Sequence, residues 1–162
     1  MLDAIRWDPE LIRRYDLAGP RYTSYPTAMQ FNSQVSPFDL LHALRESRKA
    51  LRPLSLYVHV PFCANICYYC ACNKVITKDR GRAQPYLQKL EQEIQMIACH
   101  LDPRQKVEQL HFGGGTPTFL SHDELRQLMA KLRQQFNLLD DDSGDYGIEI
   151  DPREADWSTM GL

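Results

Sequence analysis

Four cysteines, Cys63, Cys67, Cys70 and Cys72, stand within ten residues of this 162-residue chain. The first three are spaced C-x3-C-x2-C. Thiolates are soft, anionic ligands that suit iron in a sulfide cluster. Such clusters usually have four cysteine ligands, so three would leave one iron free to bind a substrate or cofactor. Three thiolates at this spacing can therefore ligate three corners of a four-iron cluster and leave one coordination site open.

The elements that must position this loop follow from the apolar patterns. Alternating side chains predict strands over residues 54–60, 107–112 and 146–151, and apolar residues at steps of three and four predict helices between them, over 82–99 and 121–136. Further helices are expected over 9–15, from Pro37 to Lys49 and near Glu154. Strands that alternate with helices predict an α/β fold with a parallel sheet and right-handed crossovers.

Three unusual motifs fall where these strands end. The cysteine loop follows the first strand, Gly113-Gly114-Gly115-Thr116-Pro117 follows the second, and Glu149 and Asp151 close the third. Ligands of parallel α/β proteins bind at the carboxyl ends of the strands. We therefore expect the three motifs to face one cavity.

Residues 60–74, VPFCANICYYCACNK, resemble the cluster loop of the radical S-adenosylmethionine (SAM) enzymes. The CACN extension, together with RYTSYPTA (21–28), HFGGGTPTFL (111–120) and IEIDPRE (148–154), resembles the oxygen-independent coproporphyrinogen III oxidase family. The resemblance implies the first three β/α units of a partial (β/α)6 TIM-like barrel, with an arm and helix in residues 1–50 and the truncated barrel domain in 51–162. By composition alone, RYTSYPTA is better explained as a surface arm.

The same resemblance implies cofactors and ligands. Cys63, Cys67 and Cys70 would hold a [4Fe-4S] cluster shielded by Phe62, Tyr68 and Tyr69, and two SAM molecules would bind. The SAM contacts carried over from the family are Tyr57, Tyr69, Gly114, Gly115, Thr116 and Glu149. No catalytic residue is assigned.

Each of these residues also has a plainer interpretation. The glycines could form a structural turn, Glu149 a solvated carboxylate, and Tyr57 a packing residue. Cys72 could be a fourth ligand that closes the site. The histidines are assigned to no metal, and Cys99 is expected to pack within a helix.

By resemblance, the reaction is the oxidative decarboxylation of two propionates of coproporphyrinogen III to give protoporphyrinogen IX, through a deoxyadenosyl radical. The electron would come from a reductase or a flavodoxin-type donor, and the full-length protein would be a monomer. The chain stops where a third crossover should begin, so we expect an inactive fragment of the enzyme. A haem chaperone of the same superfamily and a structural zinc module are the alternatives.

Composition limits the other function classes. The formal net charge of -2 lacks the basic footprint of a nucleic-acid-binding domain. No signal core or run of about 18 apolar residues is present, which predicts a cytoplasmic protein without a membrane span. Thiols stay reduced in that compartment, so the cysteines favour a metal over disulfides.

Overall fold

The computed structural model describes residues 7–17 and 27–162. Most of RYTSYPTA, residues 21–26, lies outside these described ranges, so its expected place near the site stays a prediction. Contacts divide the chain into two units, residues 1–36 and residues 37–162, and each is described by itself. None of the helices in the described ranges is long and apolar enough to cross a bilayer.

The first unit contains the predicted short helix α1, Pro9–Tyr15, and a 3-10 turn, Ala28–Gln30. The Asp8 carboxylate caps α1 by accepting hydrogen bonds from the backbone N–H groups of Glu10 and Leu11, each at 3.0 Å. Proline at the first helical position lacks only an N–H that would have no helical partner. The local sequence is therefore sufficient to start this helix.

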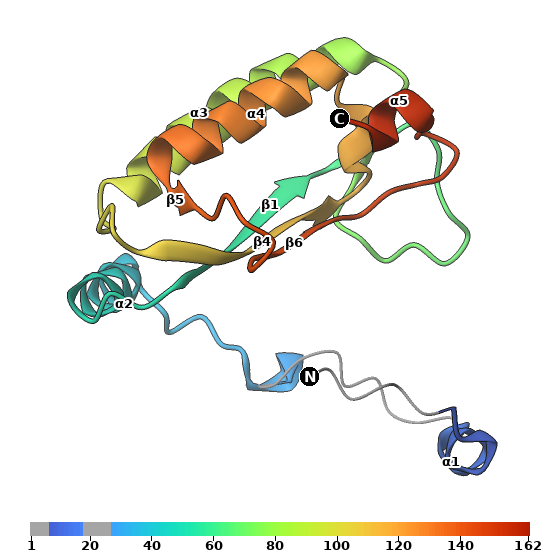
Figure 1. Ribbon diagram of the computed structural model, residues 1–162, viewed down its shortest axis with the longest axis horizontal. Coiled ribbons are helices and arrows are strands. Elements are labelled where there is room, and N and C mark those ends of the chain that lie inside the picture. The colour runs from blue at the N-terminus through green and yellow to red at the C-terminus, as the bar shows by residue number, and fades with distance from the viewer. Residues whose placement is uncertain (1–6, 18–26) are drawn as a thin grey trace. The chain divides into compact units, whose positions relative to one another are not determined.

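The second unit is built on a parallel sheet, as predicted. Its strands are β1 (Leu54–Val60), β4 (Lys106–Gly114), β5 (Asn137–Leu138) and β6 (Asp145–Ile148). β1 lies along one edge of β4, and β5 and β6 follow each other along the opposite edge. Figure 1 shows α3 (Ala83–Ala98) and α4 (His122–Gln135) side by side over one face of this sheet.

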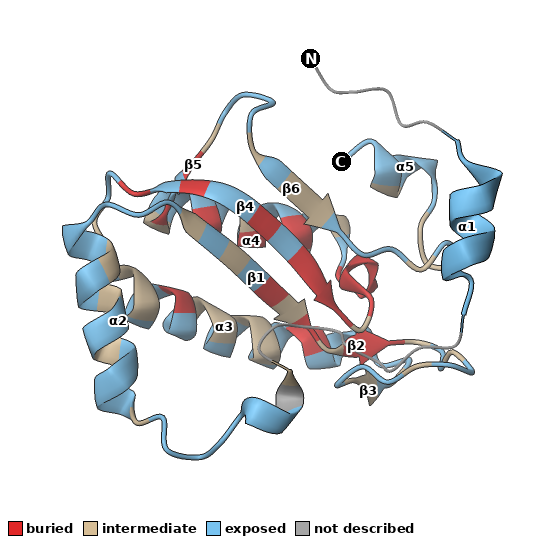
Figure 2. Ribbon diagram, turned by 90° about the horizontal axis from the view of Figure 1, so that it is seen from below, coloured by how far each residue is buried: buried red, intermediate tan, exposed pale blue. Residues whose placement is uncertain are grey.

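The core lies between these helices and the sheet. In the carboxyl-terminal halves of β1 and β4, alternate residues point toward the helices and are buried, namely Val58, Val60, Leu110 and Phe112. In Figure 2 the buried residues gather in the carboxyl-terminal part of β4 and in β2. The opposite face of the sheet is lined by exposed or half-buried polar side chains, so it is free to form a site.

Helix α2 (Pro37–Lys49) is attached to the amino-terminal end of the sheet by a buried amide. Gln105 is 1% exposed. Its Nε2 donates to the Arg52 carbonyl at 2.9 Å and to Ser47 Oγ at 3.1 Å, and its Oε1 accepts from the Asp102 N–H at 2.8 Å. A buried amide is stable only when its polar atoms are paired, so these contacts hold the helix in place.

Three predictions about elements were wrong in detail. The third strand is shorter than predicted, because the regular pairing of β6 (Asp145–Ile148) with β4 ends at Ile148 and not at residue 151. The last helix, α5 (Trp157–Met160), begins after Asp156, which caps it, and not near Glu154. Cys99 ends α3 as an exposed residue whose thiol donates to the Met96 carbonyl.

Candidate functional site

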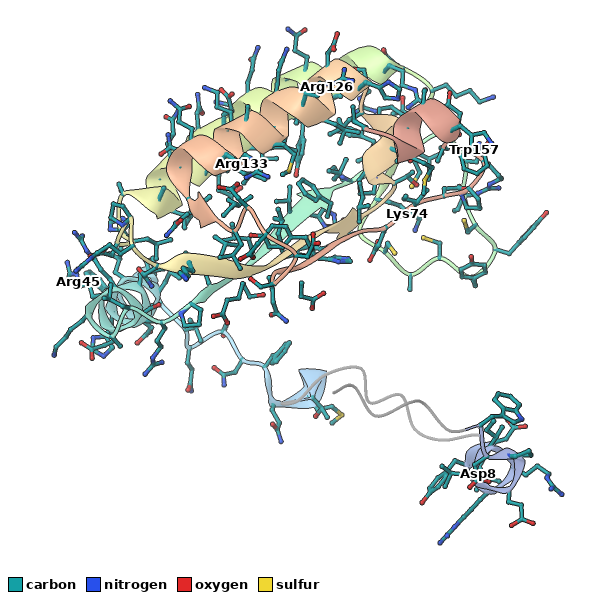
Figure 3. The ribbon with its side chains drawn as sticks, in the orientation of Figure 1. Asp8, Arg45, Lys74, Arg126, Arg133 and Trp157 are labelled. Carbon is teal, nitrogen blue, oxygen red and sulfur yellow. The ribbon has the colours of Figure 1, made fainter. Side chains whose placement is uncertain are left out.

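The cysteines lie on a loop whose two ends are joined. After β1, the chain forms β2 (Phe62–Cys63), runs through the loop and returns as β3 (Val75–Ile76), which pairs with β2 in parallel. The Val75 N–H donates to the Pro61 carbonyl at 2.7 Å, and the Thr77 N–H to the Cys63 carbonyl at 2.9 Å. The pairing confines residues 64–74 to one place beside the carboxyl end of β1. In Figure 3, Lys74 and Trp157 mark this end of the sheet.

The predicted ligands Cys63, Cys67 and Cys70 are free thiols with different surroundings. Cys63 is buried, and its Sγ lies 3.5 Å from the hydroxyl of Thr116. Cys67 and Cys70 are half-buried, and the Cys70 N–H donates to the Cys67 carbonyl at 3.1 Å. Within the described ranges, no three His, Cys, Asp or Glu side chains are gathered as a metal site.

Cys70 and Cys72 differ in their acidity. The backbone N–H of Cys72 lowers the pKa of the Cys70 thiol by hydrogen-bonding its anion. Burial and the neighbouring Cys70 raise the pKa of Cys72. The two shifts have opposite directions because the thiols interact with each other.

The glycine turn passes directly over the junction of β1 and β2. The Gly115 N–H donates to the Val60 carbonyl and the Thr116 N–H to the Phe62 carbonyl, both at 2.8 Å. A Cβ atom on Gly115 would lie 2.7 Å from the Phe62 carbonyl oxygen. Gly114 has φ +113°, a conformation that side chains rarely adopt, and its Cβ would lie 2.7 Å from the His59 ring. Glycine is therefore required at both positions by close packing.

Glu149 lies beside this turn, because β6 is parallel to β4 and the two strands end at the same edge of the sheet. Its N–H donates to the Phe112 carbonyl at 2.9 Å, which extends the ladder beyond the end of β6. Its Oε2 accepts from the Gly114 N–H at 3.2 Å, and its Oε1 lies 3.4 Å from His111 Nε2. The predicted convergence of Gly114 and Glu149 is thus observed directly.

Tyr57 lies on the same polar face. Its ring stacks on His111, with centroids 5.9 Å apart and an interplanar angle of 11°. Burial, followed by the negative charge of Glu149, raises the pKa of its hydroxyl, so the phenol stays protonated. Tyr57, His111 and Glu149 form one continuous polar surface at the end of the sheet.

His59 links this surface to the cysteine loop, although the sequence led us to assign it no role. Its Nε2 lies 2.9 Å from the Asn73 carbonyl, which can only accept, so Nε2 carries the proton. In the neutral ring, Nδ1 then accepts from the Tyr57 hydroxyl at 3.2 Å. The signal in the sequence was the alternation of Tyr57 and His59 on one face of the strand.

The segment after β6 contributes residues that the sequence did not single out. The Arg153 Nη2 donates to Cys67 Sγ at 3.4 Å, and the Asn65 amide donates to Glu154 Oε1 at 3.4 Å. Glu154 also forms an ion pair with Arg80 at 2.7 Å. Asp151–Glu154 therefore contacts the cysteine loop at two points.

Two aromatic expectations differ from the structure. Phe62 is not turned toward the loop; it is 5% exposed and packs between Phe119 and Tyr86, because it belongs to the core side of β2. Tyr68 and Tyr69 are almost fully exposed. They therefore shield nothing in this conformation, and the proposed SAM contact of Tyr69 stays a prediction.

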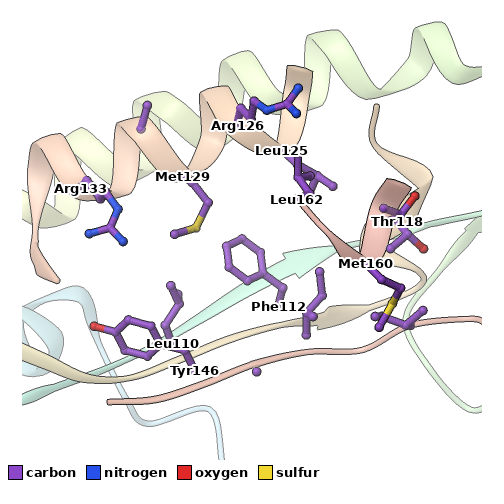
Figure 4. A pocket seen from close by; sticks show the side chains of 15 residues that line it. Leu110, Phe112, Thr118, Leu125, Arg126, Met129, Arg133, Tyr146, Met160 and Leu162 are labelled. Carbon is purple, nitrogen blue, oxygen red and sulfur yellow. The ribbon is translucent and has the colours of Figure 1, made fainter. Parts of the chain in front are cut away.

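A cavity in the second unit lies outside these residues. It has a volume of about 680 Å³ and opens between α4 and the sheet, where Leu110, Phe112, Met129 and Tyr146 line it (Figure 4). Its walls are the helix-facing residues of the strands, on the side opposite Tyr57 and Glu149. Its lining is mostly apolar, like that of a hydrophobic core, and it includes none of the residues predicted to bind the cluster or SAM.

Comparison with known proteins identifies the family. The model of the radical SAM superfamily matches residues 57–154. An oxygen-independent coproporphyrinogen III oxidase of Pseudomonas aeruginosa is 76% identical over 162 residues, which are 100% of this chain and 35% of that protein. One from Mannheimia haemolytica is 47% identical over 151 residues, covering 93% of this chain and 100% of that sequence.

This chain belongs to the radical SAM superfamily, among the oxygen-independent coproporphyrinogen III oxidases. A solved structure entitled "Coproporphyrinogen III oxidase (HemN) from Escherichia coli is a Radical SAM enzyme" matches with a TM-score of 0.77 and 42% identity. The matched region comprises 97% of this chain and 33% of the chain in the solved structure. The chain thus spans about a third of the length of the Pseudomonas and Escherichia proteins.

Membership of the radical SAM superfamily implies a [4Fe-4S] cluster and SAM. The donor set fits the cluster chemically, because three free thiols lie on one loop with its ends joined, and thiolates are the usual ligands of such clusters. The polar face beside the loop suits a charged ligand such as SAM, because the side chains of Tyr57, His111 and Glu149 are exposed there.

Proposed function

We propose that this radical SAM chain supplies the cluster-binding and part of the SAM-binding portion of an enzyme that converts coproporphyrinogen III into protoporphyrinogen IX. The observation that carries the proposal is the meeting of three strand ends: the Gly114 N–H donates to Glu149 across β4 and β6, while Thr116 lies against Cys63. Relatives of the chain are named oxygen-independent coproporphyrinogen III oxidases, which supports this substrate. The reaction is the oxidative decarboxylation of two propionate side chains, a step of haem biosynthesis.

Cys63, Cys67 and Cys70 are the proposed cluster ligands. Their thiolates would bind three irons and leave the fourth for SAM, and the bound pair would supply a deoxyadenosyl radical when an electron is delivered. Thr116 orients Cys63 through its hydroxyl. Cys72 is not included, because the C-x3-C-x2-C spacing that resembles the radical SAM loop ends at Cys70.

The SAM contacts that we propose are Tyr57, Tyr69, Gly114, Gly115, Thr116 and Glu149. Gly114 and Gly115 would bring the backbone close to the ligand, and Glu149 would accept hydrogen bonds from it. Tyr57 would present a protonated hydroxyl on the same face. Tyr69 lies on the exposed part of the loop, where it could reach the second of two SAM molecules.

The wider architecture is part of the proposal. Residues 51–162 would form the first three β/α units of a partial (β/α)6 barrel, with residues 1–50 as an arm and helix. The parallel order of β1, β4 and β6 supports this arrangement, because barrel strands follow one another in the same way. The polar face of the sheet would then be the inside of the barrel, and a reductase or flavodoxin-type protein would deliver the electron.

Anaerobic reconstitution with iron and sulfide tests the proposal. We expect about four irons and four sulfides per chain, and an electron paramagnetic resonance signal of the reduced cluster that changes when SAM is added. Cys63→Ser should abolish the cluster, whereas Cys72→Ser should leave it intact and serves as the matched control. Zinc bound without sulfide would refute the proposal in favour of a structural module.

A further inference from the structure

Arg153 is held beside the cysteine loop by its neighbour Asp151. The Asp151 carboxylate accepts hydrogen bonds from the Arg153 backbone N–H at 2.9 Å, from Nε at 3.0 Å and from Nη2 at 2.6 Å. The pairing lowers the pKa of Asp151 and raises that of Arg153, so both stay charged. This two-point contact, in which Nε and Nη2 of one guanidinium both donate to one carboxylate, is called the fork below; it is more rigid than a single hydrogen bond.

The guanidinium held in this way faces Cys67. Nη2 has two protons; one is directed to Asp151, and the other is available to the sulfur, 3.4 Å away. Sulfur accepts hydrogen bonds over longer distances than oxygen, and a charged donor makes the strongest of them. The contact therefore places a positive charge and a donor against one proposed cluster ligand.

The rest of the segment is anchored independently. The Glu154 carboxylate is 14% exposed and pairs with Arg80, whose guanidinium stacks on the buried Phe119 ring at 4.3 Å from its centroid. The other Glu154 oxygen accepts from Asn65, two residues before Cys67. Asp151–Glu154 is thus tied both to the core and to the loop, which keeps Arg153 in reach of the thiol.

We propose that Arg153 is a positioning residue for Cys67, and that its hydrogen bond to Cys67 Sγ raises the reduction potential of the cluster which this cysteine ligates. Reduction adds one negative charge to the cluster. A donor and a positive charge at a ligating sulfur stabilise the reduced form more than the oxidised form. The inference rests on the proposed cluster site.

The chain contains its own control for this test. Asp102-Pro103-Arg104 repeats the sequence of Asp151-Pro152-Arg153, and Asp102 accepts from the Arg104 N–H at 3.0 Å, from Nε at 2.9 Å and from Nη2 at 3.0 Å. The Arg104 side chain is 74% exposed and lies at the amino-terminal end of β4. Arg104→Gln therefore removes the same fork and charge far from the cysteine loop.

The measurement is the midpoint potential of the reconstituted 162-residue chain, titrated anaerobically with dithionite and followed by electron paramagnetic resonance. We expect Arg153→Gln to shift the potential to a more negative value, and Arg104→Gln to leave it at that of the unchanged chain. Arg153→Lys, which keeps the charge without the planar fork, should lie between them. Circular dichroism and iron content are recorded for each variant.

Each result decides the matter. Equal potentials for Arg153→Gln and the unchanged chain would overturn the role of Arg153 and leave the cluster site standing. If Arg153→Gln alone lost iron with the fold retained, Arg153→Lys would decide: a potential below that of the unchanged chain would support the proposal, and an equal potential would overturn it. Unfolding of both Arg153 variants, but not of Arg104→Gln, would make the residue structural and overturn the proposal. No cluster in the unchanged chain would overturn the cluster site and this inference together.

Discussion

Replacing Gly114 with alanine should destabilise the second unit through one identifiable collision. The residue has φ +113°, and its new Cβ would lie 2.7–2.9 Å from three atoms of the His59 ring. That ring is held by the Asn73 carbonyl at 2.9 Å and cannot move aside without losing the bond. The perturbation therefore combines backbone strain with the loss of a hydrogen bond to the cysteine loop.

The change in the free energy of unfolding is the sum of three contributions. Backbone strain costs about 1–2 kcal/mol, and the lost hydrogen bond about 0.5–1.5 kcal/mol. The lower entropy of the unfolded alanine chain offsets about 0.4–1 kcal/mol. We expect Gly114→Ala to lower the free energy of unfolding by about 0.5–3 kcal/mol.

Urea unfolding of the cluster-free chain measures this change. Gly161→Ala is the control, because the nearest atom to its Cβ would be 3.6 Å away, and it should change the free energy by about 0.5 kcal/mol or less. In a His59→Ala background the collision is gone, so Gly114→Ala should cost about 0.5–1.5 kcal/mol less than in the unchanged chain. An equal cost in both backgrounds would refute the collision as the cause.

Three further outcomes concern the scaffold. Gln105→Leu should lower the free energy of unfolding by about 2–3 kcal/mol, because it leaves the Arg52 carbonyl unpaired; a loss below about 1 kcal/mol in urea would contradict this. Ser121→Ala removes the capping box of α4 and should cost about 1 kcal/mol by the same assay, with an unchanged midpoint arguing against the cap. Arg104 lowers the pKa of Asp102, so the stability that this carboxylate adds is present above its unfolded pKa of about 3.9 and is lost as the pH falls through its lower folded pKa. The difference in unfolding free energy between the chain and Asp102→Asn should therefore disappear only in strong acid; a difference independent of pH would show that the pairing contributes nothing.

The helices and the longer strands could be predicted because their signals are local. Alternation over residues 54–60 and the Ser121–Glu124 capping box both appear where the sequence places them. Strands β2, β3 and β5 have only two residues each, too few for any pattern to appear. They exist because neighbouring chain segments supply their hydrogen bonds, which depends on the tertiary fold.

The candidate site divides in the same way. The cysteine spacing and the glycines indicated what kind of ligand to expect, and the parallel order of the strands predicted that Gly114 and Glu149 would meet. The sequence did not reveal that His59 joins Tyr57 to Asn73, because a histidine on a strand has no preferred partner until the loop beside it is placed.

The two Asp-Pro-Arg segments show most directly how far prediction from the sequence can go. The three residues by themselves determine the turn and the fork, which are nearly the same at Asp102–Arg104 and at Asp151–Arg153. Only the tertiary structure decides that Arg153 has a thiol within reach. The reason is that parallel strands bring their carboxyl ends together, so the turn after β6 meets the loop after β1, whereas the turn at Arg104 precedes β4 at the other end of the sheet.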